Sequence, residues 1–276
     1  MAALRLAVLI LFLVAGLVAC SRVELVYENA DWLGARQIAG YLDLDRTQRL
    51  AVRDALQDYR EFHRRERLPQ LVAFLDLTDA VLDAESVDRD RLATVFDDGE
   101  RLLTNTAEDL IPMAAETLRG LSAGQIEALE KTLAEGREDY AEEVLPERAQ
   151  RNIERIENWT GQLGRGQRAH LENCDARLPD VTEEWLQWRD RRDREFIALL
   201  RATGSKSEIE EFLRDWWLNS EARSRPLRQA RETSRQVWLE CSETLLATLT
   251  PAQTAQIRSR LQGYRGNFAT LAALGD

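Results

Sequence analysis

Apolar residues recur three and four positions apart along most of the chain, and this spacing predicts helices. After Gln253, for example, Ile257, Leu261 and Tyr264 follow in step. Such spacing places side chains on one face of an amphipathic helix. No segment shows the sustained alternation of apolar and polar residues that indicates a half-buried strand. The pattern therefore predicts an all-α fold, an elongated assembly of antiparallel helices.

Four of these helical segments open with the same short motif: Leu, a small or polar residue, two free positions and Gln. The four copies are Leu44-Asp45-x-x-Gln48, Leu121-Ser122-x-x-Gln125, Leu163-Gly164-x-x-Gln167 and Leu249-Thr250-x-x-Gln253. Asp, Ser and Thr are good N-caps, because their side-chain oxygens accept from first-turn N–H groups. A Gln three residues later can reach back to the N–H of the cap, which completes a capping box. Each motif thus predicts a helix start, and Gly164 is a tolerated cap without the side-chain bond.

A further capping box is predicted at Ser207 and Glu210, at the start of "SEIEEFLRDWW". Ser accepts at the cap and Glu reaches back to it, as in the other boxes. This motif places another helix start in the second half of the chain.

The order of the motifs suggests a duplicated chain, with halves at residues 41–145 and 160–276 joined by a connecting segment at 146–159. In each half a motif is followed by a Leu-Pro pair, a long helical region and a second motif. The distance from the motif to the Leu-Pro pair differs between the halves, however. Capping boxes also recur in unrelated helical proteins, so a duplication and four independent helix starts both remain open.

Residues 1–19 are predicted to be an export signal. Arg5 precedes an apolar run that is short for a spanning helix, and the segment ends in Leu-Val-Ala before Cys20. This ending resembles the bacterial lipobox, which implies that Cys20 is lipidated and becomes the first residue. The alternative is an uncleaved membrane anchor that ends in Cys. Ser21 resembles the residue that directs proteobacterial lipoproteins to the outer membrane, which implies the periplasmic face of that membrane.

Residues 20–40 are expected to form the lipidated start and an N-terminal helix. They contain no Gly/Ser-rich spacer of the kind that lets a domain move away from its anchor. We therefore expect the body of the protein to lie close to the membrane.

Cys174 and Cys241 are the cysteines that remain after Cys20. In an oxidising compartment they are compatible with one disulfide. Two thiols buried separately on different helices are the alternative.

The charge and the chemistry of the chain exclude several functions. A net charge of −11 argues against nucleic-acid binding and against attachment to an anionic membrane by charge. His63 and His170 are the only histidines, and we expect no metal ligand at helical spacing from either. The glycines are scattered rather than grouped in a phosphate loop, and adjacent carboxylates on a helix point apart. The sequence predicts no catalytic site, no metal and no cofactor.

Tryptophan is the residue type with the most open function. The chain has seven, and five of them fall in the second half: Trp185, Trp188, Trp216, Trp217 and Trp238. Core packing would account for them, because aromatic side chains dominate helical cores. The functional alternative is an exposed aromatic patch, rimmed by charge, that binds polypeptides.

Two family resemblances bear on function. Repeated Leu-Thr-x-x-Gln helix starts, matched fully at Leu249, Thr250 and Gln253 and with Ser at Ser122, resemble the Spy/CpxP group of periplasmic chaperones and stress regulators. That resemblance implies that four motifs in one chain mimic a dimer of such proteins, with a curved surface for polypeptides. The stretch from Cys20 to Gln48, with "HRRERLPQL" after it, resembles uncharacterised proteobacterial lipoproteins. We expect a lipid-anchored, non-enzymatic protein that binds polypeptides; the alternative is an architectural lipoprotein docking one defined partner of an envelope assembly complex.

Overall fold

Every regular element that the structure describes is a helix. The computed structural model describes residues 19–82, 89–144 and 147–274, and the all-α prediction is confirmed. The predicted export signal, up to residue 18, lies outside these residues. The helices are α2 (Ala19–Glu28), α3 (Ala30–Leu42), α4 (Arg46–Phe62), η2 (His63–Arg67), α5 (Leu68–Leu82), α6 (Arg89–Arg119), α7 (Ala123–Asp139), η3 (Tyr140–Val144), α8 (Arg148–Thr160), α9 (Arg165–Ala176), α10 (Thr182–Arg201), α11 (Lys206–Trp217), η4 (Ser220–Ala222), α12 (Arg225–Ala247) and α13 (Pro251–Ala273).

The chain passes from α4 into α5 through the π-helical turn η2. Pro69 stands at the start of α5. In a regular α-helix a proline ring would clash with the carbonyl four residues earlier. The wider turn just upstream removes this conflict, and it lets α4 and α5 run on as one long segment.

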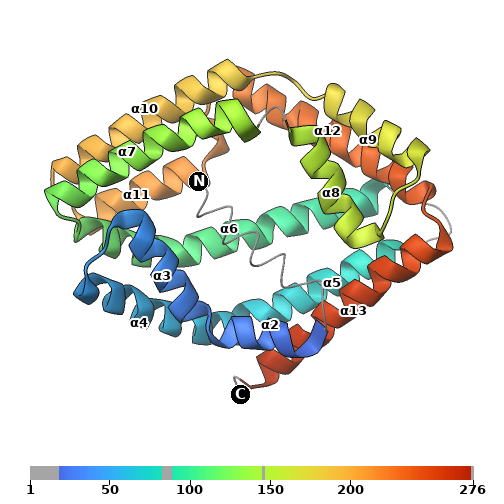
Figure 1. Cartoon of the computed structure of the whole chain (residues 1–276), viewed down its shortest axis with the longest axis horizontal. Helices are drawn as coiled ribbons and strands as arrows, with labels where there is room; N and C mark the ends of the chain where they lie inside the picture. Colours follow the sequence, from blue (N-terminus) through green and yellow to red (C-terminus); the bar gives the residue numbers. More distant parts are fainter. Residues whose placement is uncertain (1–18, 83–88, 145–146, 275–276) are drawn as a thin grey trace.

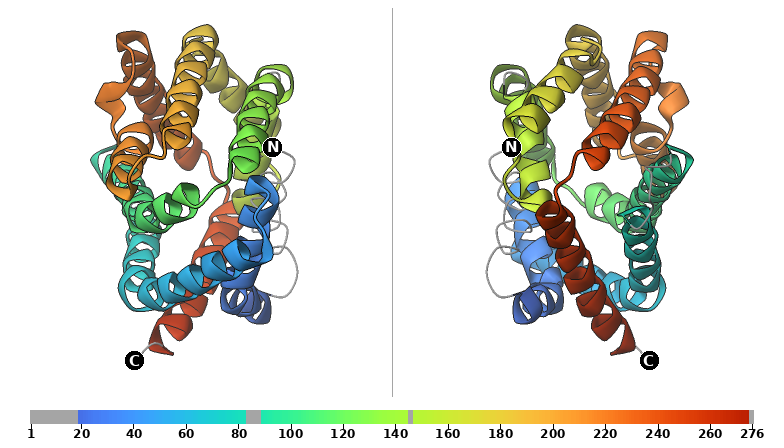
Figure 2. Two further views of the ribbon diagram at one scale, coloured as in Figure 1. Left: turned by 90° about the vertical axis from the view of Figure 1, so that its left-hand side faces the viewer. Right: turned by 90° about the vertical axis from the view of Figure 1, so that its right-hand side faces the viewer.

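The helices close into a ring in which the two halves of the chain interleave (Figure 1). Helix α7 of the first half lies against α10 of the second, and α13 of the second half lies against α5 of the first. Helix α6 also packs against α11 and α12. The two side views show the same ring from its ends (Figure 2). Because each half supplies a helix to the wall of the other, neither half forms a separate domain.

The two halves begin with equivalent helices. Helix α3 packs on α4 and α7, as α8 packs on α9 and α13. Each of the two leading helices has 13 residues and ends at a residue with positive φ, Asp43 (φ 50°) for α3 and Gly161 (φ 76°) for α8. The repeated unit thus starts earlier than the predicted bounds of 41 and 160. Most of the predicted connecting segment 146–159 is helix α8, whose amphipathic pattern is carried by few apolar residues.

The predicted N-terminal helix at 20–40 is two helices, α2 and α3, separated at Asn29. Helix α2 is held to the α4–η2 segment by polar contacts. The Tyr27 hydroxyl donates to the Arg60 carbonyl at 3.3 Å, and Arg64 pairs with Glu28 at 2.6 Å. These contacts fix the segment that leads away from Cys20.

The largest apolar core lies where α3, α6, α7, α10 and α11 meet. Its buried members include Leu42, Ile111, Leu129, Phe196 and Leu213. The other end of the ring has smaller clusters, such as Ile153, Leu163, Leu171 and Leu245. The two ends of the molecule therefore differ in how much apolar surface they bury.

Candidate binding pocket and glutamine clasps

The four motifs all begin helices. At Asp45, the backbone N–H donates to Gln48 Oε1 at 3.0 Å, and the Gln48 N–H donates to Asp45 Oδ1 at 2.9 Å. The reciprocal bonds of a capping box are also present at Ser122–Gln125 and Thr250–Gln253. At Gly164 only the bond from its N–H to Gln167 Oε1 forms, at 2.9 Å. The motif thus acts locally in the way its chemistry predicts.

The motifs also meet in pairs across the chain. Gln48 Nε2 donates to the Gly120 carbonyl at 2.8 Å, and Gln125 Nε2 donates to the Asp43 carbonyl at 2.7 Å. The two amides face each other, with Gln125 Nε2 2.7 Å from Gln48 Oε1. We call Gln48 and Gln125 the first clasp.

The second clasp, Gln167 and Gln253, has the same bonds in the second half. Gln167 Nε2 donates to the Thr248 carbonyl and Gln253 Nε2 to the Gln162 carbonyl, each at 3.0 Å. The amides again face each other at 3.0 Å. Each glutamine thus donates to the carbonyl five positions before its partner, which gives both clasps the same pseudo-twofold arrangement.

The clasps explain why the third position after the cap is Gln rather than Glu. The amide oxygen caps its own helix while the amide nitrogen donates to the partner segment, and a carboxylate has no such donor. Gln125 and Gln253 are buried, at 8% and 7% exposure, so these donor bonds are made away from water. The motif therefore serves two functions, helix capping and pairing between helices.

The additional capping box is formed by Ser205 and Glu208, and the prediction of Ser207 and Glu210 is wrong. Thr203 has a positive φ of 53° and turns the chain, so the extended backbone needed for an N-cap comes at Ser205. Ser207 is already inside α11. Glu208 has no partner glutamine among the residues that the structure describes. The third position of this box is thus Glu where no amide donor is needed, in contrast to Gln in the clasps.

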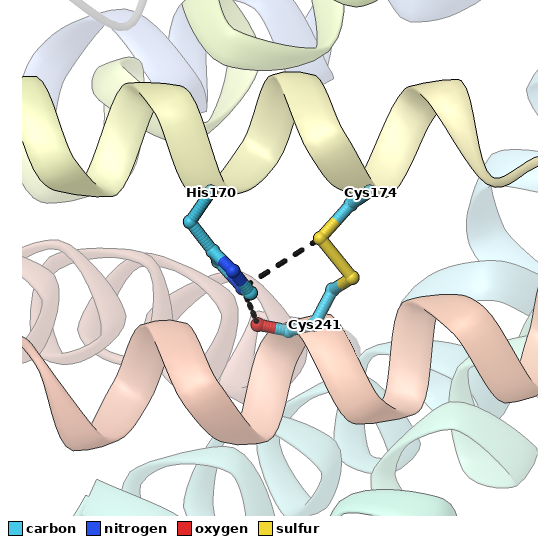
Figure 3. A group of neighbouring side chains, drawn as sticks. All are labelled: His170, Cys174 and Cys241. Atoms are coloured by element: carbon cyan, nitrogen blue, oxygen red, sulfur yellow. Dashed lines mark hydrogen bonds between the residues drawn. A yellow bond between two sulfur atoms is a disulfide. The ribbon is translucent and has the colours of Figure 1, made fainter.

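Cys174 and Cys241 form a disulfide that joins α9 to α12, with a Cα–Cα distance of 6.2 Å (Figure 3). His170 stands one helical turn before Cys174, and its Nε2 lies 3.6 Å from Cys174 Sγ and 3.1 Å from the Cys241 carbonyl oxygen. The expectation that no potential ligand stands at helical spacing from a histidine is therefore wrong. The three side chains could group around an ion, but a metal needs thiolates, which these two sulfurs are not while they are bonded to each other.

An apolar pocket of about 520 Å³ opens into the large core. Five helices wall it: α3, α6, α7, α10 and α11. Its apolar lining includes Met113, Leu133, Trp185, Phe196, Leu213 and Trp216. The volume and the apolar walls are typical of ligand pockets, which range over about 300–1,000 Å³.

The charged side chains that line this pocket are two arginines, and both are paired with a buried carboxylate. Arg137 and Arg189 line it, and both donate to Asp193, which is 3% exposed. Arg189 also lies over the Trp216 ring, 5.2 Å from its centroid. Burial raises the pKa of the Tyr41 hydroxyl, Arg189 opposes this shift and Asp193 adds to it. Tyr41 therefore remains a neutral hydrogen-bonding group at the edge of the pocket.

The five candidate tryptophans divide into three groups. Trp185, Trp216 and Trp217 line the pocket, and Trp217 is 43% exposed. Trp188 is buried and stacks on Trp185, with ring centroids 5.0 Å apart. Trp238 lies elsewhere, against the apolar clusters around the disulfide and around Ile153. Sequence spacing could not separate these groups, because all five fall on helices in the same half.

A sequence-family model matches residues 40–222, about two thirds of the chain. The chain is a member of the family of unknown function DUF6279. No curated protein matches the chain, and no solved structure does. The matched part of this DUF6279 protein contains the first clasp and the pocket residues from Tyr41 to Trp217. None of its described helices is long and apolar enough to cross a membrane.

Proposed function

We propose that this protein is a non-enzymatic binding protein of the bacterial envelope, anchored through lipidated Cys20 on the periplasmic face of the outer membrane. The lipobox-like ending before Cys20 supports the anchor. In this proposal the protein binds a polypeptide, and the pocket receives apolar side chains of the bound segment.

The observation that carries the binding proposal is the pocket itself. It combines aromatic walls with an exposed edge, where Trp217 and Tyr41 are 43% and 36% exposed. Polar groups at such an edge can bond the main chain of a segment whose apolar side chains enter the pocket. Asp193, the buried partner of the two pocket arginines, accepts from both guanidinium groups. This arrangement supports binding rather than acid–base chemistry, which needs a carboxylate free to exchange a proton.

The size of the pocket favours one defined partner over many clients. A general chaperone needs a broad surface that accepts unrelated sequences, whereas a pocket of about 520 Å³ admits only a few side chains. Docking of one partner in an envelope complex is thus the leading form of the proposal. The chaperone-like form, in which the protein shields unfolded envelope proteins or reports envelope stress, rests on the motif resemblance.

Photo-crosslinking in cells tests the pocket. A photoreactive phenylalanine analogue replaces Trp217 at the edge of the pocket in the full chain. The control carries it at Leu103, which is apolar and 74% exposed but does not line the pocket. We expect one discrete adduct from position 217, lost when Thr132→Phe fills the pocket and absent from position 103. No adduct from position 217, or one that survives Thr132→Phe, would contradict the proposal.

Light scattering separates the two forms of the proposal. Purified full chain is added to several chemically unrelated proteins as they unfold, with the Thr132→Phe chain beside it. One defined partner predicts no general suppression of aggregation. Suppression of all of them that is lost with Thr132→Phe would instead establish the chaperone-like form.

A further inference from the structure

A second cavity, of about 580 Å³, lies on the α3–α4 hairpin and differs in character from the pocket. Four arginines and two exposed apolar side chains line it: Arg36, Arg46, Arg49, Arg53, Trp32 and Leu50. Ala35 is the seventh residue of the lining, and no acidic residue belongs to it. We call the four arginines, Trp32 and Leu50 the arginine patch.

The sequence builds the patch from two helix faces. On α4, Arg46, Arg49 and Arg53 stand at spacings of three and four residues, which places them on one face together with Leu50. On α3, Trp32 and Arg36 are one turn apart, and the Arg36 guanidinium lies 5.6 Å from the centroid of the Trp32 ring. Because α3 packs on α4, the two faces join.

The arginines of the patch are largely without carboxylate partners. Within the part of the chain that the structure describes, Arg36, Arg46 and Arg49 form no ion pair, while Arg53 pairs with Asp31 at 3.2 Å. The chain as a whole carries a net charge of −11. Three neighbouring free guanidinium groups in such a chain are available to an anion from outside.

The equivalent hairpin of the second half keeps three of the four arginine positions but lacks the rest of the patch. Aligned on the clasp glutamines Gln48 and Gln167, Leu50 corresponds to Ala169 and Arg53 to Glu172. Arg36, Arg46 and Arg49 correspond to Arg155, Arg165 and Arg168. Of these three, Arg168 pairs with Glu157 at 2.5 Å. The framework shared by the halves therefore does not require the patch.

We propose that the arginine patch docks on the phosphate-bearing headgroups of an anionic phospholipid membrane. Guanidinium groups match phosphate oxygens in geometry and charge. Trp32 and Leu50, each nearly half exposed at 46% and 47%, would enter the boundary between headgroups and acyl chains, where tryptophan is favoured. Arginines alone would suit a free anion as well. The exposed apolar groups beside them favour a membrane, which offers both phosphate and acyl chains.

The position of the patch in the chain fits this assignment. Trp32 stands only 12 positions after Cys20 in the chain. Among the described residues, five of the eight large apolar side chains that are exposed fall on α2–α4: Leu25, Trp32, Leu33, Tyr41 and Leu50. The net negative charge would repel the rest of the body from an anionic surface. The patch would thus orient the protein with α3 and α4 toward the membrane. This orientation rests on the proposed anchor at Cys20, whereas the binding of the patch to lipid does not.

Hydroxyl-radical footprinting of the full chain tests the proposal. The chain is mixed with vesicles of phosphatidylcholine, with vesicles containing 30% phosphatidylglycerol, or with phosphatidylcholine vesicles and inorganic phosphate. We expect Trp32 to be oxidised at least threefold more slowly with the vesicles that contain phosphatidylglycerol, and at an unchanged rate in the other two samples. Trp217, exposed to a similar degree at 43%, serves as the matched internal control and should be unchanged.

The variants sharpen the same experiment. Arg46→Gln with Arg49→Gln should abolish the protection of Trp32, whereas Arg155→Gln with Arg165→Gln, exposed arginines on the α8–α9 hairpin, should leave it intact. Equal oxidation of Trp32 in both kinds of vesicle would overturn the proposal. Protection by inorganic phosphate to the same extent would also overturn it, in favour of a free-anion site. Failure of the anchor is scored separately, since an unanchored chain would not float with phosphatidylcholine vesicles.

Discussion

The hairpins α3–α4 and α8–α9 hold equivalent places in the two halves but carry different surfaces. Both leading helices end at a positive φ, and both second helices carry a clasp glutamine in their first turn. Among the residues that the structure describes, the arginine patch lies on α3–α4, and the aromatic pocket lies at the same end of the ring. The clasps therefore form a common framework, and the candidate functions lie where the halves differ.

The two ends of the ring also differ in what stabilises them. The first clasp sits beside the large apolar core, whereas the second sits beside a cluster of four buried apolar residues and the disulfide. Less buried apolar surface means less stabilisation from the hydrophobic effect. We infer that the disulfide supplies at the second end what the core supplies at the first.

Removing the disulfide should have the largest effect. Cys174→Ala with Cys241→Ala opens a link between residues 67 apart, and the free energy of unfolding should fall by about 4 kcal/mol. Urea unfolding measures the loss, and hydrogen exchange should rise more in α8 and α9 than in α3 and α4. A loss below about 1 kcal/mol would show that the cross-link does not support the second end.

The clasps predict the next largest effect. Gln125→Glu or Gln253→Glu removes the amide donor and turns a carboxylate toward carbonyl oxygens, so the free energy of unfolding should fall by about 2–3 kcal/mol in either half. Glu208→Gln is the matched control, because that box has no partner glutamine, and it should change stability by less than about 0.5 kcal/mol. Equal small effects at all three positions would remove the pairing function from the motif.

The caps predict smaller effects. Thr250→Ala keeps the glutamine clasp but removes the side-chain oxygen that accepts from the Gln253 N–H at 3.3 Å. The protein should lose about 1 kcal/mol, as measured by urea unfolding. An unchanged midpoint and slope would mean that the Thr250 hydroxyl does not stabilise α13.

The one motif without a side-chain cap can be improved. Gly164 has φ −68° and ψ 160°, which suit a serine cap, and a Cβ there would be 3.6 Å from its nearest neighbour, Gln167 Oε1. Gly164→Ser should therefore stabilise by a few tenths of a kcal/mol, a gain visible as a small rise in the unfolding midpoint. A fall in the midpoint would show that the second clasp does not tolerate the added side chain.

The helix starts could be predicted from local sequence, but the clasps between distant helices could not. Asp45, Ser122 and Thr250 cap where their sequence places them. The clasps join residues separated by 77 and 86 positions, so nothing near each motif indicates its partner. The preference for Gln over Glu at the four motifs, against Glu208 in the unpaired box, is the signal that could have revealed the pairing.

Sequence identified the tryptophans of the candidate site but not which of them come together. Trp185, Trp216 and Trp217 come together only because α10 and α11 fold against helices of the first half. Trp238 has the same residue type and a similar helical setting, but α12 directs it to the disulfide end. Helical periodicity gives the face on which a side chain lies, and the partner helix decides whether that face lines a pocket.

Binding of a small apolar probe tests the central claim most directly, that the folded chain has an open apolar pocket at its first end. Purified full chain is titrated with the fluorescent dye 8-anilinonaphthalene-1-sulfonate. The account predicts saturable binding of one dye per chain, lost with Thr132→Phe and with Met113→Trp and unchanged with Leu103→Ala, while all three variants keep cooperative unfolding. No saturable binding, or binding that both pocket-filling variants retain, would contradict it.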